Sequence, residues 1–201
     1  MSLFGVDSTF YKFGTAIADV FVLGLLWIIF SIPLFTVGAS TTAVYYVCTK
    51  KVSGSDAYVF TGFLKSFKRN FFASTFVTLI LGLLGYVAWI NFHLLRQVEL
   101  GMLRLPVQVS LAIVCIQLVF ITMYVFPIIS RFDTSVKGAL KTALQLSNSH
   151  LLLTIINFVL FAALGFVTMA MPVVFIFMPG IFTYFSSILF VRIFRKHKPD
   201  F

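Results

Sequence analysis

The chain has 201 residues, of which 60% are hydrophobic and only 10% are charged, and its mean hydropathy is +1.05. Soluble domains carry about 25% charged residues, so this composition excludes an ordinary soluble fold. The net charge of +9 would suggest a nucleic acid partner in a soluble protein, but here the charges separate long apolar runs. We therefore expect a membrane protein whose basic residues face an anionic inner leaflet, and no nucleic acid partner.

Stretches without charge predict the membrane spans, because about 20 apolar residues cross the hydrocarbon core as a helix. The stretch from residue 151 to 191 is about twice that length and contains Pro172, so it predicts two helices joined by a turn. The whole chain is expected to be one all-α transmembrane bundle of about five spans. Their approximate positions are 15–35, 71–95, 105–130, 151–170 and 173–194.

The first apolar stretch, residues 20–49, is too long for one span and too short for two. Pro33 and Gly38 predict a helix break, followed by a short helix over 39–48 that is rich in small residues. Thr41 and Thr42 belong to this small-residue face, on which another helix can pack closely. The sequence leaves open whether 39–48 re-enters the membrane, lies at its surface or continues the first span.

The distribution of Lys and Arg predicts the orientation, because cytoplasmic loops are enriched in both. With five spans and the N-terminus outside, 12 of the 15 basic residues fall on the cytoplasmic side and 3 on the outer side. We therefore predict an N-out, C-in arrangement with the 50–70 and 131–150 segments in the cytoplasm.

Two of the cytoplasmic segments have the periodicity of amphipathic helices, at 56–70 and 132–146. In the first, phenylalanines recur at helical spacing and are expected to face the inner leaflet. In the second, Asp133 is a candidate N-cap and an apolar stripe faces away from the lysines. We expect this second helix to dock a partner protein. The candidate docking residues are Arg131, Phe132, Asp133, Lys137 and Lys141.

Polar residues within apolar stretches are candidates for function, since each needs a partner in hydrocarbon. Asp19, Asn91 and His93 are predicted at the same outer level and could form an outer polar cluster. Such a cluster would contact a solute or partner, or simply anchor two helices through an Asp19–His93 hydrogen bond. Gln117 and Asn157 are expected to form hydrogen bonds between helices.

No catalytic or metal-binding motif is present. The sequence contains no HExxH, GxSxG or Walker motif, and its three histidines fall on different segments. Cys48 and Cys115 lie in separate apolar stretches without the spacing of a zinc or redox pair. We expect a protein that is not an enzyme and has no cofactor and no metal.

Four sequence segments occur together in an order that resembles one known family. A Leu26–Trp27 pair leads to Ile32–Pro33, and three further segments follow. These are TVGASTTA at 36–43, FLKSFKRNF at 63–71 and FPIISRFD at 126–133. Together they resemble the YesL-like family of small bacterial integral membrane proteins.

This resemblance implies a multi-pass protein of the bacterial cell membrane. Members of the family tend to be encoded beside carbohydrate ABC importers, so it implies an accessory or regulatory subunit of such an importer. The expected partners are the permease subunits, with the ATPase or the solute-binding protein as further candidates. Three alternatives stay open: a membrane partner of a two-component sugar-sensing kinase, a stand-alone secondary transporter, and an assembly or stabilising factor of the permease.

Overall fold

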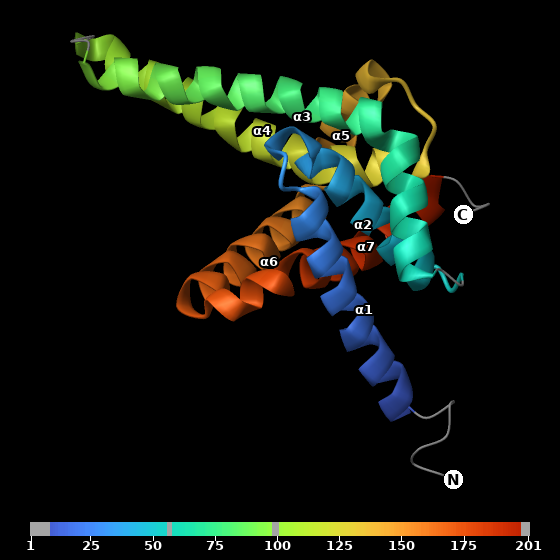
Figure 1. Cartoon of the computed structure of the whole chain (residues 1–201). Helices are drawn as coiled ribbons and strands as arrows, with labels where there is room; N and C mark the ends of the chain where they lie inside the picture. The colour runs from blue at the N-terminus through green and yellow to red at the C-terminus, as the bar shows by residue number, and fades with distance from the viewer. Residues whose placement is uncertain (1–8, 56–57, 98–100, 198–201) are drawn as a thin grey trace.

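A computed structural model describes residues 9–55, 58–97 and 101–197, and every regular element in these residues is a helix. This confirms the predicted all-α fold. Figure 1 shows the helices gathered around α2, with two arms projecting to one side. The elements in chain order are α1 (Thr9–Phe30), η1 (Leu34–Thr36), α2 (Val37–Val52), α3 (Val59–Gln97), η2 (Gly101–Leu103), α4 (Arg104–Arg131), α5 (Val136–Ser149), α6 (Leu151–Ala170), η3 (Pro172–Ile176) and α7 (Met178–His197).

The chain reverses direction between α1 and α2. α1 ends at Phe30, and Pro33 precedes the short turn of η1. The Thr36 hydroxyl lies 2.6 Å from the carbonyl oxygens of Phe30 and Pro33. It can therefore donate a hydrogen bond to the Phe30 carbonyl, which has no partner within α1 because the helix ends there. Proline cannot continue a helix, and here it begins a tight turn. The 39–48 segment is therefore part of a separate helix, not a continuation of the first.

Two side-chain contacts show that α2 runs back alongside α1. The Trp27 indole Nε1 donates to the Thr41 hydroxyl at 2.9 Å. Further along both helices, Lys51 of α2 forms an ion pair with Asp19 of α1. As residue numbers fall along α1 they rise along α2, so the two helices form an antiparallel hairpin. The chain thus returns to the end of the molecule from which α1 starts.

This hairpin conflicts with the N-out half of the predicted orientation. If the segment after Lys51 is cytoplasmic, the start of α1 lies on the same side, because Asp19 contacts Lys51. The charge argument becomes stronger, since Lys12 joins the inner group and the division becomes 13 to 2. The number of spans and the side of the membrane that each end faces stay predictions.

α2 lies at the centre of the fold, with 11 of its 16 residues buried. Gly38 permits this position, because a Cβ there would lie 2.9 Å from the Ser74 carbonyl oxygen and 1.9 Å from Thr78 Oγ1. Only glycine allows α3 to approach so closely. One turn later, the hydroxyls of Thr42 and Ser74 share a hydrogen bond of 2.9 Å.

α3 joins two segments that the sequence analysis treats separately, the amphipathic helix 56–70 and the span 71–95. Residues 56 and 57 lie outside the described residues, and α3 runs without interruption from Val59 to Gln97. Figure 1 shows that it changes direction, from a teal first part to a green second part that extends away from the centre.

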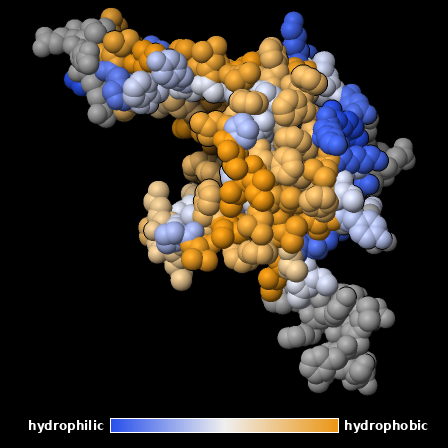
Figure 2. All heavy atoms as spheres, in the orientation of Figure 1, coloured by the Kyte–Doolittle hydropathy of each residue, from blue (hydrophilic) through white to orange (hydrophobic). Residues whose placement is uncertain are grey.

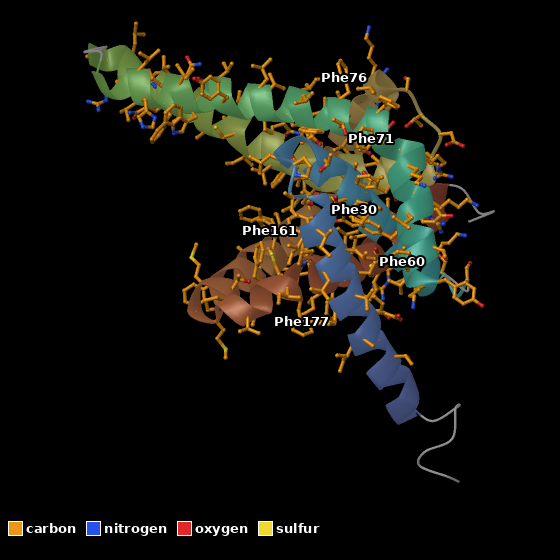
Figure 3. The ribbon with its side chains drawn as sticks, viewed as in Figure 1. Phe30, Phe60, Phe71, Phe76, Phe161 and Phe177 are labelled. Carbon is orange, nitrogen blue, oxygen red and sulfur yellow. The ribbon has the colours of Figure 1, made fainter. Side chains whose placement is uncertain are left out.

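The aromatic stripe of α3 packs mainly inside the protein and not on the inner leaflet, which corrects the prediction. Phe63 is fully buried, and its ring lies 5.3 Å from that of Phe30 on α1. Phe67 lies 4.9 Å from the same ring, whereas Phe60 remains exposed. The physical reason is that α1 folds back beside α2 and offers an aromatic surface that the sequence pattern of α3 alone does not reveal. Figure 3 shows Phe30 on α1 and Phe60 at the start of α3.

A second packed cluster joins α2, α4, α5 and α7. Its largest buried side chains are those of Tyr45, Tyr124 and Phe190. The Tyr45 hydroxyl lies 3.1 Å from the Ser186 hydroxyl, and the Tyr124 hydroxyl lies 2.8 Å from the Thr154 hydroxyl. Buried tyrosines keep their hydroxyls paired in this way, because an unpaired polar group is costly in an apolar interior.

Three helices are long and apolar enough to cross a membrane, namely Val59–Leu95, Arg104–Arg131 and Leu151–Ala170. Two shorter apolar helices, Gly14–Phe30 and Met178–Ile193, accompany them among the described residues. Gln117 donates to the Ser147 hydroxyl at 3.5 Å and so links α4 to α5. Asn157 is buried on α6, but its side-chain oxygen finds no hydrogen-bond partner within the described part of the chain.

Two arms extend from this centre. The first arm consists of the second part of α3 and the first part of α4, and the second consists of α6 and η3 (Figure 1). Figure 2 shows that the surface between them is hollowed and mostly hydrophobic. Both arms expose large hydrophobic side chains, including those of Leu83, Ile113, Leu152, Ile155 and Phe166.

Candidate functional site

A small pocket lies where α1, α2 and α7 meet. Its volume is about 140 Å³, enough for a few waters or a small solute group. An ion pair between Asp19 and Lys51 forms its polar wall, and both side chains are about one quarter exposed. The lining residues are Thr15, Ala16, Asp19, Val20, Leu23, Cys48, Lys51 and Tyr184.

The α1–α2 hairpin positions the two charged groups. Lys51 lies in the last turn of α2, where a cation is favourable because the helix dipole is negative at that end. Asp19 comes from the middle of α1 and contributes the opposite charge. Cys48, one turn before Lys51, is buried with its sulfur 3.6 Å from the Thr183 hydroxyl of α7. The pocket thus combines one paired carboxylate and ammonium with an otherwise apolar wall.

The structure does not bring the predicted outer polar cluster together. Asp19 pairs with Lys51, whereas Asn91 and His93 lie in the last part of α3 on the first arm. Asn91 donates to the Val87 carbonyl at 2.8 Å, and the His93 ring lies 3.1 Å from the Trp89 carbonyl. Both side chains are exposed and bond to their own helix. The prediction is wrong because it placed Asp19 at the outer end of a first span, and the hairpin places it beside Lys51 instead.

The five predicted docking residues lie close together in the chain but serve different roles. Phe132 packs against the α4–α5 cluster, and Arg131 is partly buried, with its Nη2 3.4 Å from the Ser53 hydroxyl. Asp133, Lys137 and Lys141 are exposed. A partner that contacts this segment would therefore meet one acidic and two basic side chains.

Most of the apolar stripe of the second amphipathic helix is not available to a partner, and Leu144 is its exposed member. Ala139 and Ala143 are fully buried against α4, so the stripe forms an internal contact. Asp133 is not the N-cap of α5, because Ser135 is the residue at that position and its hydroxyl accepts from the Gly138 amide at 3.2 Å. The helix accordingly starts at Val136, four residues later than predicted.

Sequence reasoning missed a group of cations around Tyr46. The Lys50 ammonium lies 5.1 Å from the centre of the Tyr46 ring, and the Arg69 guanidinium carbon lies 5.4 Å from it. Tyr46 and Lys50 are four residues apart on one helix, and this spacing could have predicted the contact between Lys50 and the Tyr46 ring. Arg69 comes from α3, so only the tertiary structure brings it there.

The described residues contain no group of three or more His, Cys, Asp or Glu side chains that could hold a metal ion. The pocket beside Asp19 and the cations around Tyr46 are therefore the two sites whose chemistry the structure defines. Both lie at the same end of α2.

These features define the class of the protein as a helical membrane protein, with long apolar helices around a buried, hydrogen-bonded centre. Comparison with known proteins then identifies its relatives. Residues 20–92 match a family described as "Protein of unknown function, DUF624". This match includes α2 and most of α3, which form the centre of the fold.

Two proteins of Bacillus subtilis (strain 168) are similar to the chain. "Uncharacterized protein YesL" is 28% identical over 138 residues, which cover 67% of this chain and 64% of YesL, just under two thirds of that protein. "Uncharacterized protein YteU" is 29% identical over 170 residues, covering 81% of this chain and 71% of YteU. No solved structure matches the chain. The matches confirm the predicted resemblance to the YesL-like family.

Proposed function

We propose that this chain is a non-catalytic accessory or regulatory subunit of a carbohydrate ABC importer in the bacterial cell membrane. The proposal joins the YesL-like resemblance, which implies an association with such importers, to a surface suited to lateral contact with other membrane helices. The importer permease subunits are the proposed partners.

The hollowed apolar surface between the two arms is the observation that carries this proposal (Figure 2). In the most apolar 18-residue window of α6 only 11% of the residues are buried within the chain, and in that of α3 only 17%. Within a bilayer, a concave apolar surface is occupied either by lipid or by another helix. Helices in membranes associate by close packing of such surfaces. The surface therefore offers a place for a permease helix between the arms.

The exposed side of α5 supports a second contact with the importer. Lys137 and Lys141 are exposed on this helix, which follows α4 at the end of the molecule that carries Arg131. If this end faces the cytoplasm, the two lysines can approach the ATPase subunit. Their contact would be mainly electrostatic, because most of the apolar side of α5 is already buried.

Photo-crosslinking in the native host tests the proposal. A photoreactive amino acid at Phe166, an exposed residue of the second arm, should form a covalent adduct with a permease subunit. The same amino acid at Phe60, which is also exposed but lies at the start of α3, is the matched control and should not. Adducts are identified by mass spectrometry after purification in mild detergent. Reproducible absence of importer subunits from both the adducts and the co-purified proteins would contradict the proposal.

Two of the alternative functions, the kinase partner and the stand-alone transporter, give different outcomes in related experiments. A partner of a sensor kinase would crosslink to the kinase, and its deletion would alter transcription while leaving uptake by a constitutively expressed importer intact. A stand-alone transporter would move a solute in proteoliposomes that contain this chain and no ATPase. Either result would replace the importer proposal.

A further inference from the structure

Several cationic side chains gather around Tyr46 at the end of α2, three of them from α2 and α3 and a fourth, Arg131, from α4. The Lys50 ammonium and the Arg69 guanidinium each lie within 5.4 Å of the ring centre, so they are less than 11 Å apart. Lys65, one turn before Arg69 on α3, is close enough to act electrostatically on the same phenol. We call Lys50, Lys65 and Arg69 around Tyr46 the basic face.

No carboxylate of the described residues balances the basic face. Lys51 is paired with Asp19, but Lys50, Lys65 and Arg69 form no ion pair within the described part of the chain. Like charges repel one another, so gathering three of them has an electrostatic cost that an anionic ligand would remove. The position of the face within the fold is fixed, because the Tyr46 side chain is 8% exposed and packs with the cluster around Phe63.

The Arg69 side chain is held in place and still has N–H donors that form no hydrogen bond within the described residues. Its Nη2 donates to the Ser130 carbonyl, at the end of α4, at 3.2 Å, and the group lies over the Tyr46 ring. A guanidinium carries five N–H donors, so most of them remain for a ligand. Because a planar guanidinium matches the oxygens of a phosphate, a positioned Arg beside two flexible lysines favours a phosphate group.

The surroundings of the basic face favour a phosphate that is attached to hydrocarbon chains. Phe60 and Phe72, on the same helix, are 56% and 85% exposed. Figure 2 shows hydrophilic atoms over the first part of α3, directly beside the hydrophobic surface that covers most of this view. Figure 3 shows Phe60, Phe71 and Phe76 in that order along α3. A ligand bound here would have its phosphate at the basic face and apolar chains along α3.

We propose that the basic face is a binding site for the phosphate headgroup of an anionic glycerophospholipid. The proposal does not depend on the importer partner, since it concerns only residues of this chain. The lipid phosphate would accept hydrogen bonds from Lys50 and Lys65 on one side and from the Arg69 fork on the other, while its acyl chains pack on the exposed phenylalanines.

Lipid titration of the purified full-length chain tests this site. The chain in a neutral detergent is titrated with phosphatidylglycerol, with phosphatidylcholine and with inorganic phosphate, and bound lipid is counted by native mass spectrometry. Phosphatidylglycerol should bind most tightly. The double variant K50Q/K65Q should weaken its binding by about tenfold or more, since each basic residue near an anionic surface contributes about 1 kcal/mol. Neither lysine is fully buried, and glutamine forms helices about as well as lysine, so this variant should fold.

A matched control removes the same charge elsewhere. K137Q/K141Q takes two exposed lysines from α5 and should change phosphatidylglycerol binding by less than about twofold. Equal weakening by the two double variants would show that net charge and not the site attracts the lipid, and would overturn the proposal. Equal affinity for the two lipids would also overturn it. If inorganic phosphate displaced the lipid at equal concentration, the site would bind a soluble phosphate compound and the lipid assignment would be wrong.

Discussion

At the scale of single residues, the close approach of helices depends on glycine. At Gly24 of α1 a Cβ would lie 1.7 Å from the Ile176 carbonyl oxygen, an overlap that only a backbone movement could relieve. Gly82 of α3, by contrast, has no atom within 4 Å of the place of its missing Cβ. The two positions look alike in sequence, as glycines within apolar helices, but only one of them is required by packing.

Gly24→Ala should therefore destabilise the protein, and Gly82→Ala should not. Overpacking costs about 1–3 kcal/mol, which corresponds to a melting temperature lower by roughly 2–4 °C for each kcal/mol in a chain of this size. Gly82→Ala should raise the melting temperature slightly, because alanine forms helices better than glycine by up to about 1 kcal/mol. Thermal unfolding in detergent measures both. Similar melting temperatures for the two variants would contradict the close contact between α1 and η3 at Gly24.

The ion pair between Asp19 and Lys51 shows how a residue acquires its role from its neighbour. Asp19 is surrounded by apolar residues in the sequence, and this pattern correctly predicts that its carboxylate needs a partner. The partner is a lysine 32 positions later, which the return of α2 brings into contact. The need for a partner follows from the residue type, but the identity of the partner follows from the hairpin.

At the scale of elements, amphipathic periodicity locates helices but does not say what covers the apolar side. Both periodic segments, 56–70 and 132–146, are largely helical in the structure. In each of them the apolar side packs mainly on other helices of the same chain, Phe63 on α1 and Ala139 on α4. The same stripe could pack on lipid, on a partner or on its own chain, since all three remove it from water.

The start of α5 provides a test at this scale. Ser135→Ala removes the hydroxyl that accepts from the Gly138 amide, and should lower the free energy of unfolding by about 1 kcal/mol. Asp133→Ala, two residues earlier, should have little effect because Asp133 does not cap the helix. Thermal unfolding of both variants in the same detergent measures the difference. A larger effect from Asp133→Ala would restore the cap that the sequence predicts.

At the scale of the whole molecule, the hairpin of α1 and α2 decides which ends lie together. Arg131 reaches Ser53 and Arg69 reaches Ser130, so the end of α2, the start of α3 and the end of α4 meet. The ion pair at Asp19 adds the first half of α1 to this end. The basic residues of α2, of the first part of α3 and at the end of α4, which sequence counting assigns to separate segments, therefore meet at one end of the structure.

Cysteine labelling tests the resulting orientation. After Cys48 and Cys115 are replaced by alanine, single cysteines are introduced at Gly14, Ser55, Met102 or Met171. A membrane-impermeant maleimide should label the variants at 102 and 171 in intact cells, and those at 14 and 55 only after permeabilisation, because the hairpin places the start of α1 beside the 50–55 segment. Labelling of the Gly14→Cys variant in intact cells, without labelling at 55, would restore the N-out arrangement.

The sequence by itself determined the helical class, the membrane setting, the approximate positions of the helices and the break at Pro33. These depend on composition and on local periodicity, which each segment carries within itself. Only the tertiary structure decided that α2 returns beside α1, that Asp19 pairs with Lys51 and that Arg69 joins Lys50 at Tyr46. The reason is that these contacts link residues 14 to 32 positions apart through turns whose direction no local pattern specifies.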